Sequence, residues 1–388
     1  MKFVIITHVQ HINIENDYFA YAPYVREMNI WFKHVGEVMI VAPLSKGKNI
    51  SAIDLSYKHH KLQFISVPSF HFTRFLSLLK SLVILPGIML TIYRAMCQAS
   101  HIHLRCPGNM GLLGAIVQIA FPNIPKTAKY AGNWDPKSKQ PLAYRMQKWI
   151  LSNTYLTKNM RVLVYGEWEG SSQNIKPFFT ATYSEKDKVD IDDLLANRLA
   201  LLQQSQVRLL FVGTLSKGKQ PLYAIQLAEQ LSQLGYAVRL DLYGEGVQRK
   251  QLETYIHEKD LLNNVFLQGN QTADTVKTAY KESHFLILPS QSEGWPKVIA
   301  EAMFWGCVPI ATPVSCIPTM LNQVQRGLLL TMDIESDIQQ LRNIIDQKTV
   351  YQSKATHAAI WSRQYTMDYF EAEIRELVQG VKSLLDSN

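Results

Sequence analysis

Two short segments in the second half of the chain carry glycine and lysine in patterns suited to a phosphate group. GTLSKGK (213–219) combines a turn glycine with Lys217 and Lys219 just before an expected helix. Backbone amides and cations at a helix start attract anions. GEG (244–246) forms a tight turn, and its glycines let a ligand approach the backbone closely. Both segments therefore qualify as parts of a phosphate site.

A third segment, PSQSEGWPKVIAEAM (289–303), carries two carboxylates. Glu293 lies in a loop after an apolar run, and Glu301 lies on the helix that follows. Lys297 stands four residues before Glu301 on the same helix face, so these two could equally form an ordinary surface ion pair. Order and spacing favour a function, because three such loops in sequence can point at one ligand.

Short apolar runs place these loops at the carboxyl ends of strands, where open α/β sheets bind ligands. Helical stretches separate the runs, which predicts parallel sheets covered on both faces. The fold class expected is α/β, with two Rossmann-like, doubly wound domains facing across a cleft. The expected strands are 3–7, 37–43, 63–68, the start of 101–108, 126–130, 162–166, 207–213, 238–244, 265–269, 285–290 and 308–312.

The length of 388 residues suits two or three domains. We expect an N-terminal domain over 1–190 and a C-terminal domain over 200–365, joined by the polar segment 167–193. A last helix over 366–388 could cross back to the first domain.

The composition indicates a soluble globular protein, with 47% apolar and 19% charged residues. Four cysteines form no CxxC pair, which favours free thiols in a reducing compartment. The net charge of +8 is uneven. Residues 1–200 hold 23 basic and 13 acidic side chains, against 17 and 19 in residues 201–388. The first half could therefore meet an anionic membrane, a phosphorylated substrate or nucleic acid, although it has no nucleic-acid motif.

The segment 70–97 is the most apolar of the chain. Its uncharged run, 81–93, is shorter than the ~20 residues that span a bilayer. A buried helix and a helix lying on a membrane surface both fit. The N-terminal run is too short for a secretory signal, so we expect a cytoplasmic protein or one peripheral to the inner face of the membrane.

The second half resembles the donor-binding domain of family 4 retaining glycosyltransferases, the glycosyl transferases group 1, which have the GT-B fold. The resemblance covers roughly 205–330 and is most specific at 285–314, which carries a Glu-x7-Glu pattern. It implies a metal-independent enzyme of hexosyltransferase type, without a cofactor. The implied substrates are a nucleoside-diphosphate sugar of UDP or GDP type and a glycan or lipid-linked acceptor, as in surface polysaccharide or glycoconjugate assembly.

The resemblance also implies roles for individual residues. Glu293 would bind hydroxyls of the donor sugar, and Glu301 the ribose hydroxyls. Lys219 would contact the diphosphate, with Lys217 as its rival, and the region from Gly269 to Gln271 would lie near the base. The full donor set is Gly213, Thr214, Lys217, Lys219, Gly244, Gly246, Gly269, Ser290, Glu293, Gly294, Trp295, Pro296, Lys297, Val298 and Glu301.

The sequence departs from the family at three places. Thr214 stands where an arginine usually follows the turn glycine, so Lys217 would have to replace that cation. No glycine-rich loop follows the first strand, where 7–13 reads THVQHIN. The acceptor-side histidine has no match, because KYAGNWD occupies 129–135.

Acceptor-side candidates follow from their position after strands. Trp134 could stack on a sugar ring or pack on its own domain, and His8 and His11 could reach the ligand or be structural. The candidates are His8, His11, Arg105, Asn109, Asn133, Trp134 and Asp135.

No metal site is expected. Asp190 and Asp192 form a DxD pattern, but an acidic helix start explains it better. The alternatives to a transferase are a non-catalytic nucleotide-sugar or glycan-binding protein and, as a weaker candidate, a GT-B epimerase or phosphorylase.

Overall fold

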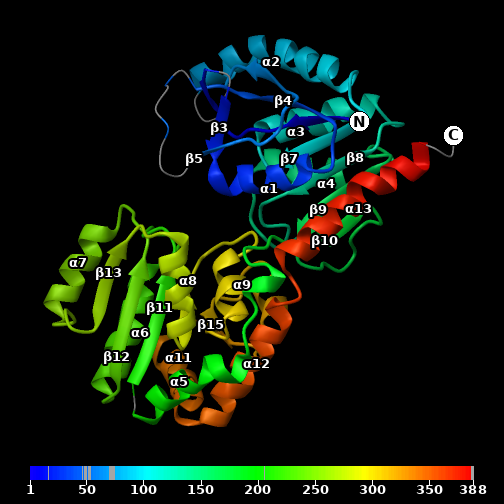
Figure 1. The fold of residues 1–388 in the computed structure, drawn as a ribbon. Coiled ribbons are helices and arrows are strands. Elements are labelled where there is room, and N and C mark those ends of the chain that lie inside the picture. Colours follow the sequence, from blue (N-terminus) through cyan, green and yellow to red (C-terminus); the bar gives the residue numbers. More distant parts are fainter. Residues whose placement is uncertain are drawn as a thin grey trace. The chain divides into compact units, whose positions relative to one another are not determined.

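The computed structural model describes residues 1–15, 17–45, 47, 50, 54–69, 75–204 and 206–385, without the side chains of 75–83 and 380–385. The chain divides into two compact units (Figure 1). The N-terminal unit comprises Met1–Phe178 and the chain from Glu371 onward, and the C-terminal unit is Phe179–Phe370. Part of the apolar segment 70–97 lies outside the described residues.

The N-terminal unit is built on a seven-stranded sheet in the order β10-β9-β8-β7-β1-β4-β6, with every pair parallel. Its central strands are almost entirely buried, as expected for a sheet covered on both faces. The strands are β1 (Lys2–Ile6), β4 (Glu37–Pro43), β6 (Leu62–Val67), β7 (His101–Cys106), β8 (Lys126–Tyr130), β9 (Met160–Tyr165) and β10 (Ile175–Phe178).

The helices of this unit connect the strands of the large sheet. They are α1 (Ala22–Phe32), α2 (Phe75–Met96), α3 (Asn109–Val117) and α4 (Leu142–Ser152). A second, antiparallel sheet contains β2 (Ile12–Ile14), β3 (Asp17–Tyr21) and β5 (Asp54–Ser56). No sequence pattern predicted this small sheet, because its strands are only three to five residues long.

The C-terminal unit repeats the plan with six parallel strands in the order β13-β12-β11-β14-β15-β16. The strands are β11 (Gln206–Val212), β12 (Ala237–Tyr243), β13 (Val265–Gly269), β14 (Phe285–Leu288), β15 (Val308–Ala311) and β16 (Leu328–Leu329). The helices are α5 (Ile191–Gln203), α6 (Pro221–Gln233), α7 (Arg249–Glu258), α8 (Ala273–Glu282), α9 (Lys297–Phe304), α10 (Ile317–Met320), α11 (Ile334–Asp346) and α12 (Lys348–Ser362).

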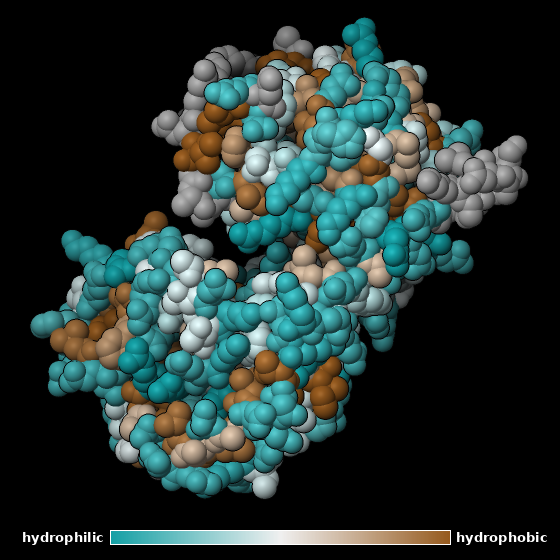
Figure 2. Space-filling view, in the orientation of Figure 1, coloured by the Kyte–Doolittle hydropathy of each residue, from teal (hydrophilic) through white to brown (hydrophobic). Residues whose placement is uncertain are grey.

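Two parallel, doubly wound α/β sheets confirm the predicted fold class. The visible surface is mostly hydrophilic with separate apolar patches, while the strands supply the cores (Figure 2). The prediction for 167–193 was wrong in part: it contains β10, the edge strand of the first sheet. This strand escaped notice because it is four residues long, half polar, and includes Pro177, which is tolerated at a sheet edge.

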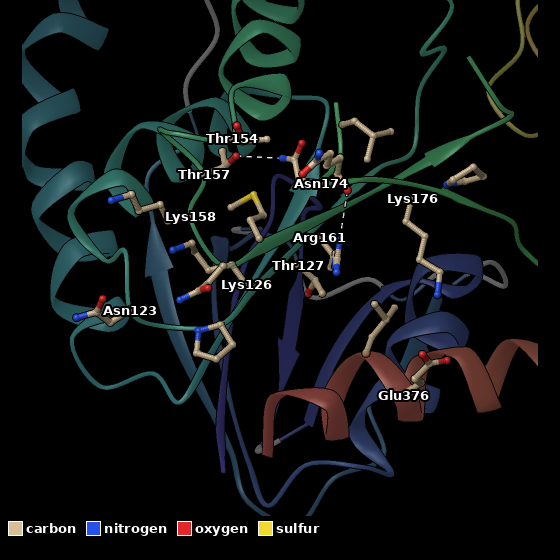
Figure 3. A pocket seen from close by; sticks show the side chains of 17 residues that line it. Asn123, Lys126, Thr127, Thr154, Thr157, Lys158, Arg161, Asn174, Lys176 and Glu376 are labelled. Atoms are coloured by element: carbon tan, nitrogen blue, oxygen red, sulfur yellow. Dashed lines mark hydrogen bonds between the residues drawn. The ribbon is translucent and has the colours of Figure 1, made fainter. Parts of the chain in front are cut away.

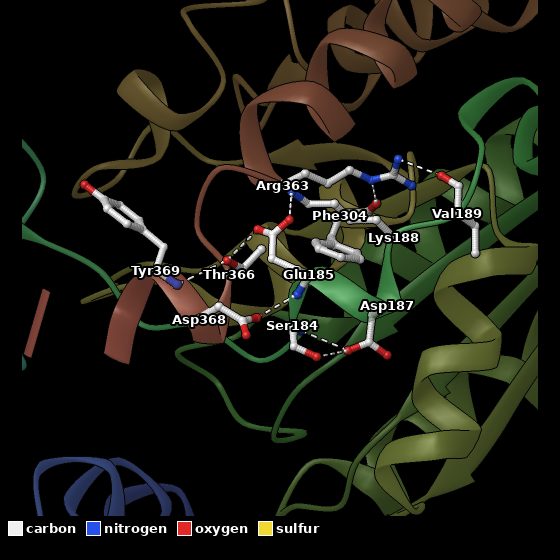
Figure 4. A network of polar contacts seen from close by, with 10 residues as sticks. All are labelled: Ser184, Glu185, Asp187, Lys188, Val189, Phe304, Arg363, Thr366, Asp368 and Tyr369. Carbon is white, nitrogen blue, oxygen red and sulfur yellow. Dashed lines mark hydrogen bonds and ion pairs between the residues drawn. The ribbon is translucent and has the colours of Figure 1, made fainter. Parts of the chain in front are cut away.

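Polar contacts tie together the segments that enter and leave the C-terminal unit (Figure 4). The Glu185 amide donates to Asp368 Oδ2 at 2.7 Å, and Thr366 Oγ1 donates to Glu185 Oε1 at 2.9 Å. Arg363 donates to the Val189 carbonyl at 2.8 Å. These contacts therefore fasten the segment that enters the C-terminal unit after Phe178 to the segment that leaves it before Glu371.

Helix α13 (Met367–Leu385) begins in the C-terminal unit and continues in the N-terminal one. From Glu371 onward it packs with the first unit, where Glu371 pairs with Lys33 at 2.7 Å and Glu373 pairs with Lys176 at 2.7 Å. The chain therefore crosses between the units twice, near Phe178 and again within this helix.

The end of α2 packs into the N-terminal unit. Ile88, Ile92 and Ala95 are buried, whereas Leu90 and Tyr93 on the other face are exposed. No helix in the described part of the chain combines the length and apolarity needed to cross a bilayer. For residues 88–96, the structure thus fits a helix half buried against its own domain.

Three of the described histidines in the N-terminal unit are buried, His11, His101 and His103. His101 Nε2 and His103 Nδ1 each lie 2.9 Å from the Thr127 hydroxyl. Burial lowers the pKa of both rings to about 3, and it lowers the pKa of His11 to about 4. These rings are neutral in the folded protein at pH values where an unfolded chain would protonate them.

We predict that the free energy of unfolding falls as the pH drops from about 6.5 to about 4. The unfolded chain binds protons in this range and the folded chain does not, so each buried histidine adds a slope of up to about 1.4 kcal/mol per pH unit. His103→Phe, which keeps a ring beside Phe3 and Trp31, should remove one such increment in urea unfolding followed by circular dichroism. His257→Phe, at an exposed position, is the control, and equal slopes in the two variants would contradict the prediction.

Candidate functional site

Backbone hydrogen bonds join the loops that follow β11, β12 and β13. The Gly213 amide donates to the Tyr243 carbonyl at 2.9 Å, and the Leu215 amide donates to the Glu245 carbonyl at 3.0 Å. The Gly244 amide donates to the Gly269 carbonyl at 2.8 Å. Three loops at the carboxyl edge of the sheet are thus held as one surface.

The glycines of 244–246 allow this close approach between loops. A Cβ atom on Gly244 would lie 2.0 Å from the Gly213 carbonyl oxygen, and one on Gly246 would lie 2.2 Å from the Leu215 carbonyl oxygen. Gly244 also has a φ of +135°, which L side chains rarely adopt. We expected these glycines to admit a ligand, but in the structure they make room for the neighbouring loop.

An ion pair links the loop after β11 to the loop after β14. Lys219 Nζ lies 2.5 Å from Glu293 Oε1, and the side chains are 30% and 10% exposed. The Gln291 amide donates to the Gly218 carbonyl at 2.9 Å, which fastens the same two loops through the backbone. Lys217 lies nearby in sequence but its side chain is exposed. Of the two lysines, Lys219 is therefore the one that the fold holds in place.

Helix α9 begins beside this ion pair in the sequence. Its N-cap is Pro296, which provides no side-chain cap, and its first turn has no acidic residue. The preceding loop is fixed by Ser315 Oγ, which donates to the Gly294 carbonyl at 3.0 Å, and by Trp295, whose ring meets that of Tyr365 edge-on at 6.0 Å. A helix start of this kind attracts an anion.

Glu301 is oriented by two hydroxyl groups. Thr182 Oγ1 donates to one carboxylate oxygen at 2.7 Å, and the Tyr280 hydroxyl donates to the other at 3.0 Å. Tyr280 is fully buried, and desolvation followed by the charge of Glu301 holds its pKa well above the usual value, so it remains a donor. A carboxylate has about four lone-pair positions and can accept further bonds. The alternative weighed from the sequence, a surface ion pair with Lys297, is not the contact that these hydroxyl groups make with Glu301.

The remaining donor-side candidates lie in the same loops. Thr214 is exposed, and Ser290 is buried with no hydrogen-bond partner for its hydroxyl among the described residues. Gly269 has a φ of +69° and ends β13. Lys297 and Val298 form the first turn of α9. All of them belong to the C-terminal unit, at the ends of β11 to β14 or at the start of α9.

The loop proposed for sugar stacking is occupied by its own contacts. Trp134 is buried, meets the Tyr130 ring edge-on at 4.8 Å, and lies under Lys148 Nζ at 5.1 Å. Asn133 and Asp135 accept backbone amides two residues ahead, at 2.9 and 2.8 Å. The structure therefore favours the second alternative, in which the tryptophan packs on its own domain.

Among the other acceptor candidates, His11 is fully buried, with its Nδ1 2.8 Å from the Val9 carbonyl and its Nε2 2.7 Å from the Tyr57 hydroxyl. A structural role fits it better than ligand binding. His8 is exposed, and its ring lies against Gly108, where a Cβ would come within 2.8 Å of Nδ1. Asn109 begins helix α3.

Arg105 belongs to a buried cluster that sequence reasoning missed. It donates to Glu27 Oε1 at 3.1 Å, and Lys129 Nζ lies 3.0 Å from the same oxygen. The side chain of Arg105 is only 14% exposed, and its guanidinium lies over the Tyr24 ring at 5.4 Å. Glu27 on α1 is 78 residues from Arg105 and still farther from Lys129 in the chain, so no local pattern could have indicated the cluster.

Asp190 caps helix α5, since its side chain accepts the amides of Asp192 and Asp193 at 2.8 and 3.1 Å. This is the acidic helix start that the sequence favoured over a metal-binding DxD. Within the described ranges, no group of three or more histidine, cysteine, aspartate or glutamate side chains has the geometry to hold a metal ion.

Comparison with known proteins finds similarity to glycosyltransferases in the C-terminal part of the chain. Residues 199–356 match the family model of glycosyl transferases group 1. An uncharacterized glycosyltransferase of Methanocaldococcus jannaschii is 23% identical over 139 residues, which is 36% of this chain and 39% of the relative. A putative colanic acid biosynthesis glycosyltransferase of Escherichia coli K12 is 28% identical over 130 residues, 32% of each protein. The matched region thus spans well under half the length of these relatives.

Solved structures resemble the whole chain. Sucrose-phosphate synthase from Thermosynechococcus elongatus has a TM-score of 0.68 at 16% identity, covering 99% of both chains. HepE of Anabaena in complex with UDP has a TM-score of 0.66 at 15% identity, covering 98% of this chain and 100% of the other. This likeness confirms the GT-B fold that the sequence resemblance predicted.

The joined loops lead to a prediction for Gly244→Ala. The added methyl group collides with the Gly213 carbonyl and imposes backbone strain, so we expect a loss of about 2–4 kcal/mol in the free energy of unfolding. Gly218→Ala is the matched control, because a Cβ there meets nothing within 4 Å and should change stability by less than about 0.5 kcal/mol. Urea denaturation measures both, and similar values would disprove the steric argument.

Proposed function

We propose that this chain, whose residues 199–356 match the family model of glycosyl transferases group 1, is a retaining glycosyltransferase. It transfers a sugar, of hexosyl type, from a nucleoside-diphosphate donor to a glycan or lipid-linked acceptor. The observation that carries the proposal is the ion pair of Lys219 and Glu293, which joins two loops at the carboxyl edge of the family-matched sheet. Open α/β sheets bind their ligands at this edge.

In this proposal, Lys219 and the start of α9 hold the donor diphosphate. Breaking the bond between the sugar and the diphosphate leaves negative charge on the departing phosphate. A fixed ammonium group and the positive end of a helix dipole stabilise that charge without reorganising. The ion pair with Glu293 keeps the long lysine side chain directed toward its neighbouring loop before the donor arrives.

Glu293 would bind hydroxyl groups of the transferred sugar. Its carboxylate uses one oxygen for Lys219, and it retains lone pairs for sugar hydroxyls. At 10% exposure it is shielded enough for such hydrogen bonds to be strong. Glu301, oriented by Tyr280 and Thr182, would accept both ribose hydroxyls of the nucleotide.

Retention is explained by attack on the same face from which the diphosphate leaves. The acceptor oxygen forms a bond to the anomeric carbon while the bond to the phosphate oxygen breaks. The acceptor proton passes to an oxygen of the departing phosphate, so no protein nucleophile is needed. This route suits a set of donor-side residues that is cationic and hydrogen-bonding rather than nucleophilic.

A UDP-sugar is the first donor to test, because HepE of Anabaena binds UDP, and a GDP-sugar is the second. The name of the Escherichia coli relative supports a role in polysaccharide or glycoconjugate assembly, at the cytoplasmic side of the membrane. Thr214, at the usual arginine position, favours one alternative: a nucleotide-sugar-binding protein without turnover. Transfer to a matched acceptor separates the two.

We predict that Glu293→Gln and Lys219→Met each lower transfer at least about 100-fold, the usual cost of losing a group that stabilises developing charge. The assay follows labelled sugar from the active nucleotide sugar to its acceptor in the presence of EDTA, where the wild type should remain active. Glu258→Gln, on the exposed end of α7, should leave the rate unchanged. Lys217→Met decides between the two lysines, and a larger loss there than in Lys219→Met would overturn the assignment.

We predict that Glu301→Gln raises the Kd for the nucleoside diphosphate about tenfold, which corresponds to about 1.4 kcal/mol. Tyr280→Phe should raise it less, because it only removes the hydroxyl that orients the carboxylate. Isothermal titration calorimetry measures the Kd of both variants. Repeating the titration with the nucleoside monophosphate shows whether the lost affinity lies in the ribose contact. Unchanged affinity in Glu301→Gln would disprove its role.

A further inference from the structure

A basic pocket lies at the amino ends of β8, β9 and β10, the opposite edge of the N-terminal sheet from the strand ends that carry Arg105 and Trp134 (Figure 3). Its volume is about 900 Å³. Four cationic side chains line it against one carboxylate, that of Glu376 on α13. The cations are Lys126, Lys158, Arg161 and Lys176.

Two of these cations are already engaged, and two are available. Lys176 pairs with Glu373 at 2.7 Å, and Lys126 is buried, donates to the Phe121 carbonyl at 2.5 Å, and has its pKa lowered by desolvation to about 8. Lys158 and Arg161 are exposed, and neither is in an ion pair with any carboxylate of the described residues. Arg161 is held by a hydrogen bond to the Gln173 carbonyl at 3.2 Å. The pocket therefore has a positive charge that the protein does not neutralise.

Exposed aromatic and apolar side chains gather at this same edge. In parallel α/β units the helices run back along the sheet, so their carboxyl ends lie at the amino ends of the strands. The carboxyl end of α2 exposes Tyr93, the turn after α3 exposes Ile119, and the end of α4 exposes Trp149. Tyr155, in the connection from α4 to β9, is 77% exposed, and Lys158 Nζ lies 5.2 Å from the centre of its ring.

Aromatic rings beside unpaired lysine and arginine are the combination that stabilises a protein at a membrane–water interface. The rings sit among the headgroups, and the cations meet the negative surface. We propose that this edge of the N-terminal unit docks on an anionic lipid bilayer. Lys158 and Arg161 contact headgroup phosphates in the pocket, and Trp149 and Tyr155 enter the interface.

Two observations favour a bilayer over a free anion or a nucleic acid. Exposed apolar and aromatic side chains lie at the ends of three successive helices on the same edge of the sheet as the pocket, and a small anion in the pocket would leave them uncovered. These rings also lie outside the cation-lined pocket, since none of them lines it, whereas binding of single-stranded nucleic acid uses aromatic platforms within the basic groove. The proposal is independent of the sugar-transfer activity.

Co-sedimentation with lipid vesicles tests the proposal on the full chain. We expect binding to vesicles of phosphatidylcholine with 30% phosphatidylglycerol, weakened by salt, and at least tenfold weaker binding to phosphatidylcholine alone. Lys158→Glu/Arg161→Glu should lower binding at least tenfold. Trp149→Ser/Tyr155→Ser should lower it several-fold while the salt dependence persists. Circular dichroism verifies that each variant is folded.

The matched control is Lys250→Glu/Lys348→Glu, which makes the same charge change at exposed positions of the C-terminal unit and should bind vesicles like the wild type. Equal loss in this control, or wild-type binding by Lys158→Glu/Arg161→Glu, would overturn the proposal. The proposal would also be overturned if the wild type bound glycerol phosphate or duplex DNA but no vesicles, and if Lys158→Glu/Arg161→Glu abolished that binding. Calorimetry with the nucleotide distinguishes this result from a failure of the proposed donor site.

Discussion

The loops proposed to bind the donor depend on one ion pair, Lys219 with Glu293 at 2.5 Å. It joins loops that are 74 residues apart in the chain, and the hydrogen bond from the Gln291 amide to Gly218 repeats the connection in the backbone. A cation and a carboxylate with 30% and 10% exposure interact more strongly than an exposed surface pair, since little water screens them. Their position at the ends of parallel strands is what makes a nucleotide-sugar site the natural interpretation.

The sequence was sufficient for the fold class and for placing the candidate loops at the carboxyl edge of the second sheet. Apolar runs marked nearly every strand of the two large sheets, and the spacing of Glu293 and Glu301 identified the most specific segment. The sequence was insufficient where the geometry of the candidate site depends on contacts between residues far apart in the chain. Tyr280 and Thr182 orient Glu301 from 21 and 119 residues away, and neither belongs to a recognisable pattern. For Trp134 the sequence left two alternatives open, and the structure favours packing on its own domain, because Tyr130 and Lys148 contact its ring.

The uneven charge of the chain has a structural counterpart in the N-terminal unit. Arg105 and Lys129 are buried around Glu27 near the carboxyl ends of their strands, where their charge is shielded from solvent. At the amino ends of the strands, the exposed positive charge comes from Lys158 and Arg161, beside Tyr155. The two ends of the same strands thus differ: at one end two cations are buried around a carboxylate, and at the other two exposed cations lie near an exposed aromatic ring.

A crystal structure of the protein soaked with UDP, and in parallel with GDP, tests the central claim most directly. The account predicts a diphosphate oxygen within about 3 Å of Lys219 Nζ, next to the first amides of α9, with the ribose hydroxyls hydrogen-bonded to Glu301. A nucleotide bound elsewhere on the chain, or a diphosphate held at this edge without Lys219, would contradict it.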